Sequence, residues 1–256
     1  MMVYAPFTAV CLLLSNQVWP DEPSPATQEL ANAVYKLNVP AVRALIKRGA
    51  KLHPYMFHLA VNGRDKIDTR LTILRELHKA GFDPKDPVPL LSAVQVSDPR
   101  TVKYLLEKGA PADPDERVVG LYRPLFYAIT VGEPEKVRLL LDYGASATEP
   151  CARRQWPKEQ TSVTVTWPLQ AAAYHGKLQA AKLLVAKGAK VNFQNRAGET
   201  ALHSAALKPK NEGMIRYLLS IGARTDIKTH AGETPSMIAK RKGYKENVAA
   251  LSPRKQ

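Results

Sequence analysis

The sequence GETALHSAA, residues 198–206, opens a unit that recurs along the chain and decides the fold. An amphipathic run from Met214 to Leu219 follows it, and Gly222-Ala223 closes it. Related units open at Val88-Pro89-Leu90, Arg123-Pro124-Leu125, Trp167-Pro168-Leu169 and Thr234-Pro235-Ser236. Repetition at a period of about 33 residues is typical of a stacked helical solenoid. In such a fold we expect function on one extended surface and not in a deep catalytic pocket.

The residue type at each key position of this unit has a physical explanation. Thr200 is expected to accept a backbone N–H at the start of a first helix, and the Pro that follows in most units suits a first helical turn, where its missing N–H is not needed. Ala205 and Ala206 keep that helix slim, so that neighbouring units can approach. Leu218 and Leu219 are expected to bury the second helix, and Gly222 to end it in a left-handed conformation.

These units resemble the ankyrin repeat, whose mark is T-P-L-H-x-A followed by two helices and a finger-like turn. The resemblance implies an all-α solenoid of stacked helix-turn-helix units with finger loops. Gln28 to Gly49 and Tyr55 to Gly81 fit the same register as degenerate units, the second with Met56 where Pro is expected. We therefore predict about seven units in one repeat domain over residues 27–251.

The net charge of +14 is unevenly placed. Residues 1–150 hold 18 Lys or Arg against 17 Asp or Glu, whereas residues 151–256 hold 19 against 6 and end in a basic tail, 252–256. Such a basic half is expected to attract an acidic protein, an anionic lipid or a nucleic acid. The alternative is a solvated surface whose only role is to keep the protein soluble.

The N-terminus resembles a targeting segment. Residues 1–20 hold an apolar core, Ala5 to Leu14, that has the length of a secretory signal and is too short to span a bilayer. A Pro-rich linker, residues 21–26, separates it from the first unit. This order predicts export to the periplasm or outside the cell. No basic residue precedes the apolar core and no clean cleavage site follows it, so a cytoplasmic protein with an N-terminal helix or a misplaced start codon is the alternative.

One finger carries an insertion, residues 145–166. The spacing from Gly144 to Pro168 is 11 residues longer than the corresponding spacing from Gly188 to Ala201. Residues 162–166 alternate as a strand does, which predicts an extended hairpin or loop that projects from the finger edge. Insertions in repeat proteins map to loops, often on the binding face, and Arg153, Arg154 and Trp156 are side chains of the kind that anchor interfaces.

The resemblance also implies which surface binds, because proteins of the ankyrin family bind with the finger tips and the exposed face of the first helices. Carried onto this chain, it selects Thr130, Val131, Tyr174, His175, Leu207, Lys208, Arg241 and Lys242 on the helices, and Gln194, Arg196, Ala197, Lys228, His230 and Ala231 on the fingers. We expect an acidic protein in this concave basic groove, bound by a monomer.

No enzymatic chemistry, metal or cofactor is predicted. None of the six His has metal-ligand spacing, and there is no phosphate-binding loop or G-x-S-x-G motif. Cys151, close to Arg153 and Arg154, is expected to have a lowered pKa. Two alternatives to the acidic-protein hypothesis stay open: an immunity protein that neutralises a secreted bacterial toxin, and direct binding of anionic lipid or nucleic acid by the basic half.

Overall fold

The computed structural model describes residues 24–53, 55–114, 122–155 and 163–252. The predicted signal segment 1–20, the start of the linker, Trp156 and all of the basic tail except Ser252 lie outside the described residues. Within these ranges, no helix is both long and apolar enough to cross a membrane.

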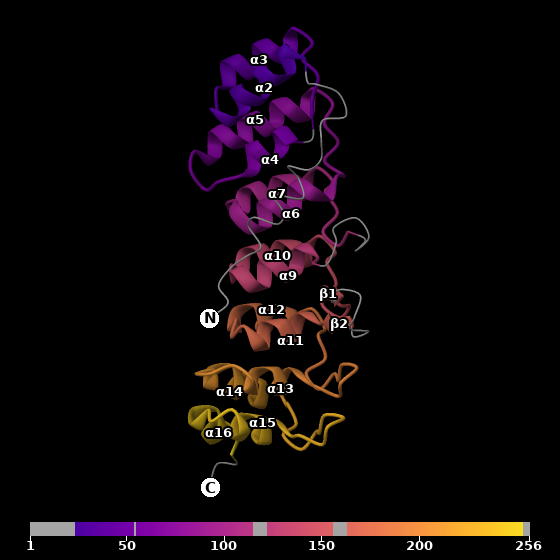
Figure 1. The fold of residues 1–256 in the computed structure, drawn as a ribbon, viewed down its shortest axis with the longest axis vertical. Helices are drawn as coiled ribbons and strands as arrows, with labels where there is room; N and C mark the ends of the chain where they lie inside the picture. The colour runs from indigo at the N-terminus through magenta and orange to yellow at the C-terminus, as the bar shows by residue number, and fades with distance from the viewer. Residues whose placement is uncertain (1–23, 54, 115–121, 156–162, 253–256) are drawn as a thin grey trace.

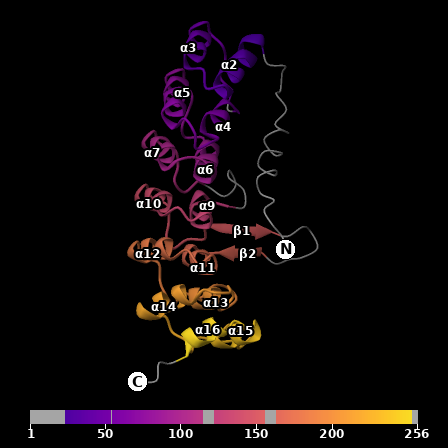
Figure 2. The same cartoon turned by 90° about the vertical axis from the view of Figure 1, so that its left-hand side faces the viewer.

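The described residues form seven helix pairs that stack along one axis (Figure 1), as the repeat pattern predicts. Figure 2 shows that the first helices of the pairs form one row and the second helices another. The pairs are α2 (Pro25–Tyr35) with α3 (Val39–Lys47), α4 (Tyr55–Val61) with α5 (Ile67–Lys79), α6 (Pro87–Val96) with α7 (Pro99–Glu107), α9 (Pro124–Val131) with α10 (Pro134–Asp142), α11 (Pro168–Tyr174) with α12 (Leu178–Ala186), α13 (Ala201–Ala206) with α14 (Glu212–Ser220), and α15 (Pro235–Arg241) with α16 (Lys245–Leu251).

Two helix starts differ from the repeat pattern. The first turn of α2 begins at Pro25, inside the predicted linker, because the Ser24 hydroxyl accepts the N–H of Thr27. Helix α6 begins at Pro87, two residues before the expected Pro89, because Asp86 provides the N-cap. Side-chain oxygens that accept the orphan N–H groups of a first turn set where a helix starts.

Small residues let the first helices approach one another. Ala172 and Ala173 in α11 and Ala205 and Ala206 in α13 are fully buried, so the two helices pack along their length. Each second helix ends where the sequence predicts, and Gly222 after α14 has a φ of +89°. That conformation costs Gly little and other residues more.

A ladder of side-chain donors joins successive units on the side of the helix row opposite the fingers. Each donor lies at the start of a second helix and reaches a carbonyl near the end of the preceding unit's first helix. The pairs are Ser97 with Val61, Lys136 with Val94, Lys177 with Val131, Asn211 with Ala173 and Asn247 with Ala206. These contacts satisfy C-terminal carbonyls that a helix leaves without partners.

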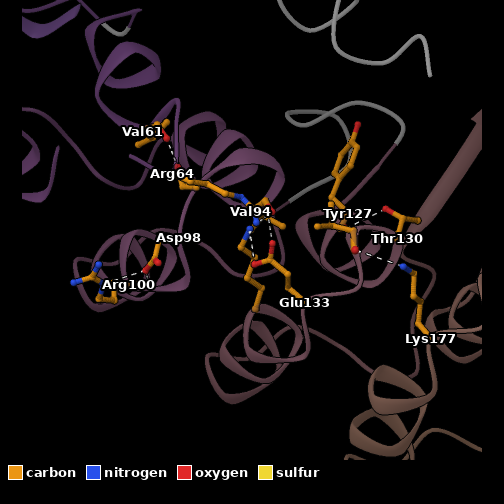
Figure 3. A network of polar contacts seen from close by, with 12 residues as sticks. Val61, Arg64, Val94, Asp98, Arg100, Tyr127, Thr130, Glu133 and Lys177 are labelled. Carbon is orange, nitrogen blue, oxygen red and sulfur yellow. Dashed lines mark hydrogen bonds and ion pairs between the residues drawn. The ribbon is translucent and has the colours of Figure 1, made fainter. Parts of the chain in front are cut away.

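The ladder includes a buried charge, Lys136, whose partners Val94 and Glu133 are labelled in Figure 3 together with Arg64. The Lys136 side chain is fully buried; its Nζ donates to Val94 O at 2.9 Å and lies 3.1 Å from Glu133. Arg64, from the connection between α4 and α5, also pairs with Glu133, so this clasp spans the intervening unit. Burial lowers the pKa of Lys136, while Glu133 opposes that shift.

The insertion contains a hairpin of β1 (Ala152–Gln155) and β2 (Val163–Thr166), paired antiparallel with Ala152 opposite Thr166. The strand predicted for residues 162–166 is therefore present. The base of the hairpin is tied to the preceding finger, because the N–H of Arg123 donates to Cys151 O at 3.0 Å and Tyr122 bridges to Ala152. The inserted finger thus extends a small sheet and does not project alone.

Candidate binding surface

The predicted helix residues lie at the ends of successive first helices. Tyr174 is the last residue of α11 and is 46% exposed, with His175 directly after it. Lys208 follows α13, and Arg241 and Lys242 lie at the end of α15; all three are exposed. The stack therefore brings these residues to the same edge of the helix row, one unit apart.

The predicted finger residues come from two adjacent fingers. Gln194 and Arg196 lie between α12 and α13, and Lys228 and His230 between α14 and α15. Gln194 Nε2 donates to Gly198 O at 3.0 Å and to Lys228 O at 3.4 Å, and the N–H of His230 donates to Ala197 O at 2.9 Å. These bonds hold the two fingers in register, so Gln194 has a structural role there.

Arg241 differs from the other predicted cations. Its guanidinium donates to both carboxylate oxygens of Glu233, at 2.7 and 3.0 Å. The hydrogen bonds from Arg241 and its positive charge lower the pKa of the Glu233 carboxyl. The pair neutralises Arg241 within the chain, which the sequence pattern did not indicate.

The other predicted cations, two on the fingers and two at the first-helix ends, have no such internal ion pair within the described part of the chain. Among the described residues, none of Arg196, Lys208, Lys228 and Lys242 has a carboxylate within 4.0 Å. The N-terminal units are different, because many of their cations have acidic partners: Arg43–Glu76, Arg64–Glu133, Arg70–Asp65, Arg100–Asp68, Lys103–Glu107, Arg123–Asp113 and Arg138–Glu135. The ion pairs therefore offset many cations in the N-terminal units and leave these four cations of the C-terminal units without internal partners in the described ranges, which adds to the charge difference seen in the sequence.

Arg153 and Arg154 lie on β1, on the edge where the inserted finger meets the stack. Their strand pairs with β2, which leads directly into Trp167 and α11. The backbone of the two arginines is thus held close to the first helix of the most basic half. Trp156, the third predicted anchor, lies outside the described residues.

Sequence reasoning missed an aromatic cluster beside His175. Tyr122 stacks on Phe126 with ring centroids 4.7 Å apart and meets Tyr127 edge-on at 5.7 Å, and Phe126 lies 6.4 Å from His175. Burial raises the pKa of Tyr127 to about 12. Burial and the nearby Lys208 and Lys177 lower the pKa of His175, which keeps it neutral at pH 7. The adjacent Phe126-Tyr127 in the opening of the fourth unit was the available signal.

Other candidate groups are structural. His203 Nδ1 accepts the N–H of Thr200 at 3.1 Å, so its Nε2 carries the proton and donates to Glu233 O at 3.2 Å. His203 therefore links the start of its own helix to the next finger. In the described part of the chain, no cluster of three His, Cys, Asp or Glu side chains has the geometry to hold a metal ion.

The expectation for Cys151 was wrong. Its thiol is buried, and burial raises its pKa to about 12. Desolvation penalises the thiolate more than nearby positive charge favours it. Position along the sequence suggested an exposed thiol beside two arginines, but the base of the hairpin encloses it.

Comparison with known proteins agrees with the repeat architecture. Residues 168–256 match a family model of ankyrin repeats in three copies. The chain is 37% identical over 65 residues to "Putative ankyrin repeat protein L271" of Acanthamoeba polyphaga mimivirus, an alignment that covers 25% of this chain and 9% of that protein. It is 36% identical over 84 residues to the "Transient receptor potential cation channel subfamily A member 1 homolog" of Caenorhabditis elegans, covering 33% and 7%.

Human "Neurogenic locus notch homolog protein 4" is 35% identical over 95 residues, covering 37% of this chain and 5% of that protein. The chain thus spans less than a tenth of the length of these relatives. Among solved structures, the ankyrin repeat domain of Bcl-3 superposes with a TM-score of 0.65 at 27% identity, over 87% of this chain and 97% of that chain. Residues 168–256 thus match the ankyrin-repeat family model, and the helix pairs of the described residues stack as in an ankyrin repeat domain.

Proposed function

We propose that this protein is a non-enzymatic module that binds an acidic protein along the fingers and first-helix ends of its last three units, α11 to α16. Ankyrin repeats generally bind protein partners, and the family is typically a non-enzymatic scaffold. We propose in addition that the partner is acidic and that it binds in the concave groove between the fingers and the first helices. We further propose that the protein binds as a monomer and that residues 1–20 direct its export, which N-terminal sequencing of the native protein would test.

The observation that carries the proposal is the set of cations without internal partners. Arg196 and Lys228 lie on adjacent fingers, and Lys208 and Lys242 on adjacent first-helix ends. Protein surfaces with one sign of charge raise the local concentration of oppositely charged partners and speed their association. Because these side chains are exposed, that effect should weaken as salt screens them.

Three anionic probes distinguish the candidate partners: fluorescent polyglutamate, single-stranded DNA and phosphatidylserine vesicles. We expect polyglutamate to bind most tightly, with an affinity that falls as salt is raised. The double variant Arg196→Glu, Lys228→Glu should weaken that binding about tenfold or more, which corresponds to about 1.4 kcal/mol.

The matched control reverses two cations of the N-terminal units, Lys103→Glu and Arg138→Glu. Both side chains are exposed and lie on second helices beside acidic neighbours. The proposal requires that this control bind polyglutamate within about twofold of the wild type, allowing for the long-range effect of net charge. Equal loss in both double variants, or tighter binding of DNA or vesicles, would reject it.

A further inference from the structure

A pocket lies between the inserted finger and the finger that follows it. Its volume is about 300 Å³. One side is formed by Ala147, Thr148 and Glu149, at the start of the insertion, and the other by Lys190 and Phe193 of the next finger, with Trp167 also in the lining. The insertion that interrupts the repeat pattern therefore also builds one wall of a pocket.

Two aromatic rings shape this pocket. The ring centroids of Trp167 and Phe193 lie 5.1 Å apart at an angle of 49°, and Phe193 is 38% exposed. Buried Leu169 and Ala189 add apolar surface beneath them. Tilted ring pairs leave faces and edges that favour a further aromatic group.

Two opposite charges stand at its rim. Glu149 and Lys190 both line the pocket and are exposed. Neither has an ion-pair partner within 4.0 Å among the residues that the structure describes. The carboxylate of Glu149 is thus an available hydrogen-bond acceptor, while Lys190 continues the row of cations formed by Arg196 and Lys228 on the fingers.

We infer that the pocket binds one aromatic side chain with a hydrogen-bond donor, Tyr or Trp, from an acidic segment of the partner. This inference rests on the proposed function. A volume at the lower end of the range for ligand pockets suits a single side chain. The ring of the partner's Tyr or Trp packs on Trp167 and Phe193, and its O–H or N–H donates to the carboxylate of Glu149. A carboxylate next to it in the partner's sequence pairs with Lys190. Aromatic anchors in pockets carry much of the affinity of protein interfaces.

Acidic peptides that differ only in a central Tyr, Phe or Ala, flanked by aspartates, test the inference with the full chain. We expect the Tyr peptide to bind about tenfold more tightly than the Ala peptide, which is about 1.4 kcal/mol. Thr148→Trp should fill the pocket and abolish that preference. Gln179→Trp, at an exposed position on α12 in the outer row, is the matched control and should keep it.

A second variant tests the acceptor without filling the pocket. Glu149→Ala, which removes the acceptor, should bring the Tyr and Phe peptides to similar affinity, although removal of a negative charge should tighten both. Thermal melting of each variant establishes that it is folded.

The outcomes separate the two proposals. Equal, salt-sensitive affinity for the Tyr and Ala peptides would overturn the pocket inference and leave the proposed function standing. A Tyr preference that survives in Thr148→Trp would also overturn it, because the anchor would then bind elsewhere. No binding of any acidic peptide would reject the proposed function and the inference together.

Discussion

Asn211 joins three units through its buried side chain and its backbone N–H. Its Nδ2 donates to Ala173 O at 2.8 Å and to Ala205 O at 3.1 Å, and its backbone N–H donates to Asn247 Oδ1 at 3.1 Å. Asn211→Ala leaves two carbonyls without this donor in a buried environment. We expect a loss of about 1–3 kcal/mol in the free energy of unfolding, measured with urea.

Asn192 provides the control for that measurement. It also bridges two units, because its Nδ2 donates to Gly222 O at 2.9 Å and its Oδ1 accepts the N–H of Arg224 at 2.9 Å. Asn192 is exposed, so water can replace both bonds, and Asn192→Ala should cost less than about 1 kcal/mol. Equal losses for the two variants would contradict the assigned effect of burial.

Cys151 gives a prediction about reactivity and pH. Because burial raises the pKa of its thiol to about 12, maleimide at pH 8 should not modify it in the folded protein and should do so in urea, as peptide mapping can show. Rapid labelling of the folded protein would contradict this. An unfolded thiol ionises at lower pH than the buried one, so its contribution to stability is constant below about pH 9 and falls as the pH rises above that.

Gly198 lies where two successive fingers pack closely against each other. Its φ is +77°, and a Cβ there would lie 2.9 Å from the backbone N of His230 on the next finger. Gly232 occupies the same turn of the last finger with a φ of +78°, and a Cβ there would have none of the described atoms within 4 Å. Gly232→Ala should cost about 1 kcal/mol from backbone strain alone.

Gly198→Ala should cost more than Gly232→Ala by about 1 kcal/mol or more, because overpacking adds to the strain. It should also weaken the hydrogen bond from His230 to Ala197, which amide exchange at His230 would report. Equal destabilisation of the two variants would show that the fingers can separate without cost.

The elements that could be predicted from sequence depend on local pattern. The helix pairs follow from apolar spacing and closing glycines, and β2 follows from the alternation of residues 162–166. The clasp formed by Lys136, Glu133 and Arg64 could not be predicted, because Arg64 is far from the other two in sequence and lies two units away. The same holds for Arg241, whose neutralisation by Glu233 depends on the turn of the last finger.

At the scale of the whole molecule, charge is divided along the stack. The N-terminal units hold cations and carboxylates in near balance, whereas the C-terminal units carry cations that lack internal partners among the described residues. In an elongated repeat protein each unit contacts mainly its neighbours, so the two halves respond to solution conditions separately. Counting charged residues in the sequence already shows that the two halves differ in net charge. Only the structure shows which of the described cations lack an acidic partner.

Salt should therefore stabilise one end of the molecule selectively. Repulsion among the cations of α13 to α16 opposes folding there, and screening relieves it, because the Debye length falls from about 30 Å at 0.01 M salt to about 8 Å at 0.15 M. Hydrogen exchange measured helix by helix should slow in α13 to α16 by about two- to fivefold over this range. Exchange in α2 to α7, where ion pairs are screened instead, should stay constant or quicken slightly. The variant Lys208→Gln, Lys240→Gln, Lys242→Gln should lose the salt response of the C-terminal helices, and a uniform response along the stack would contradict this division of charge.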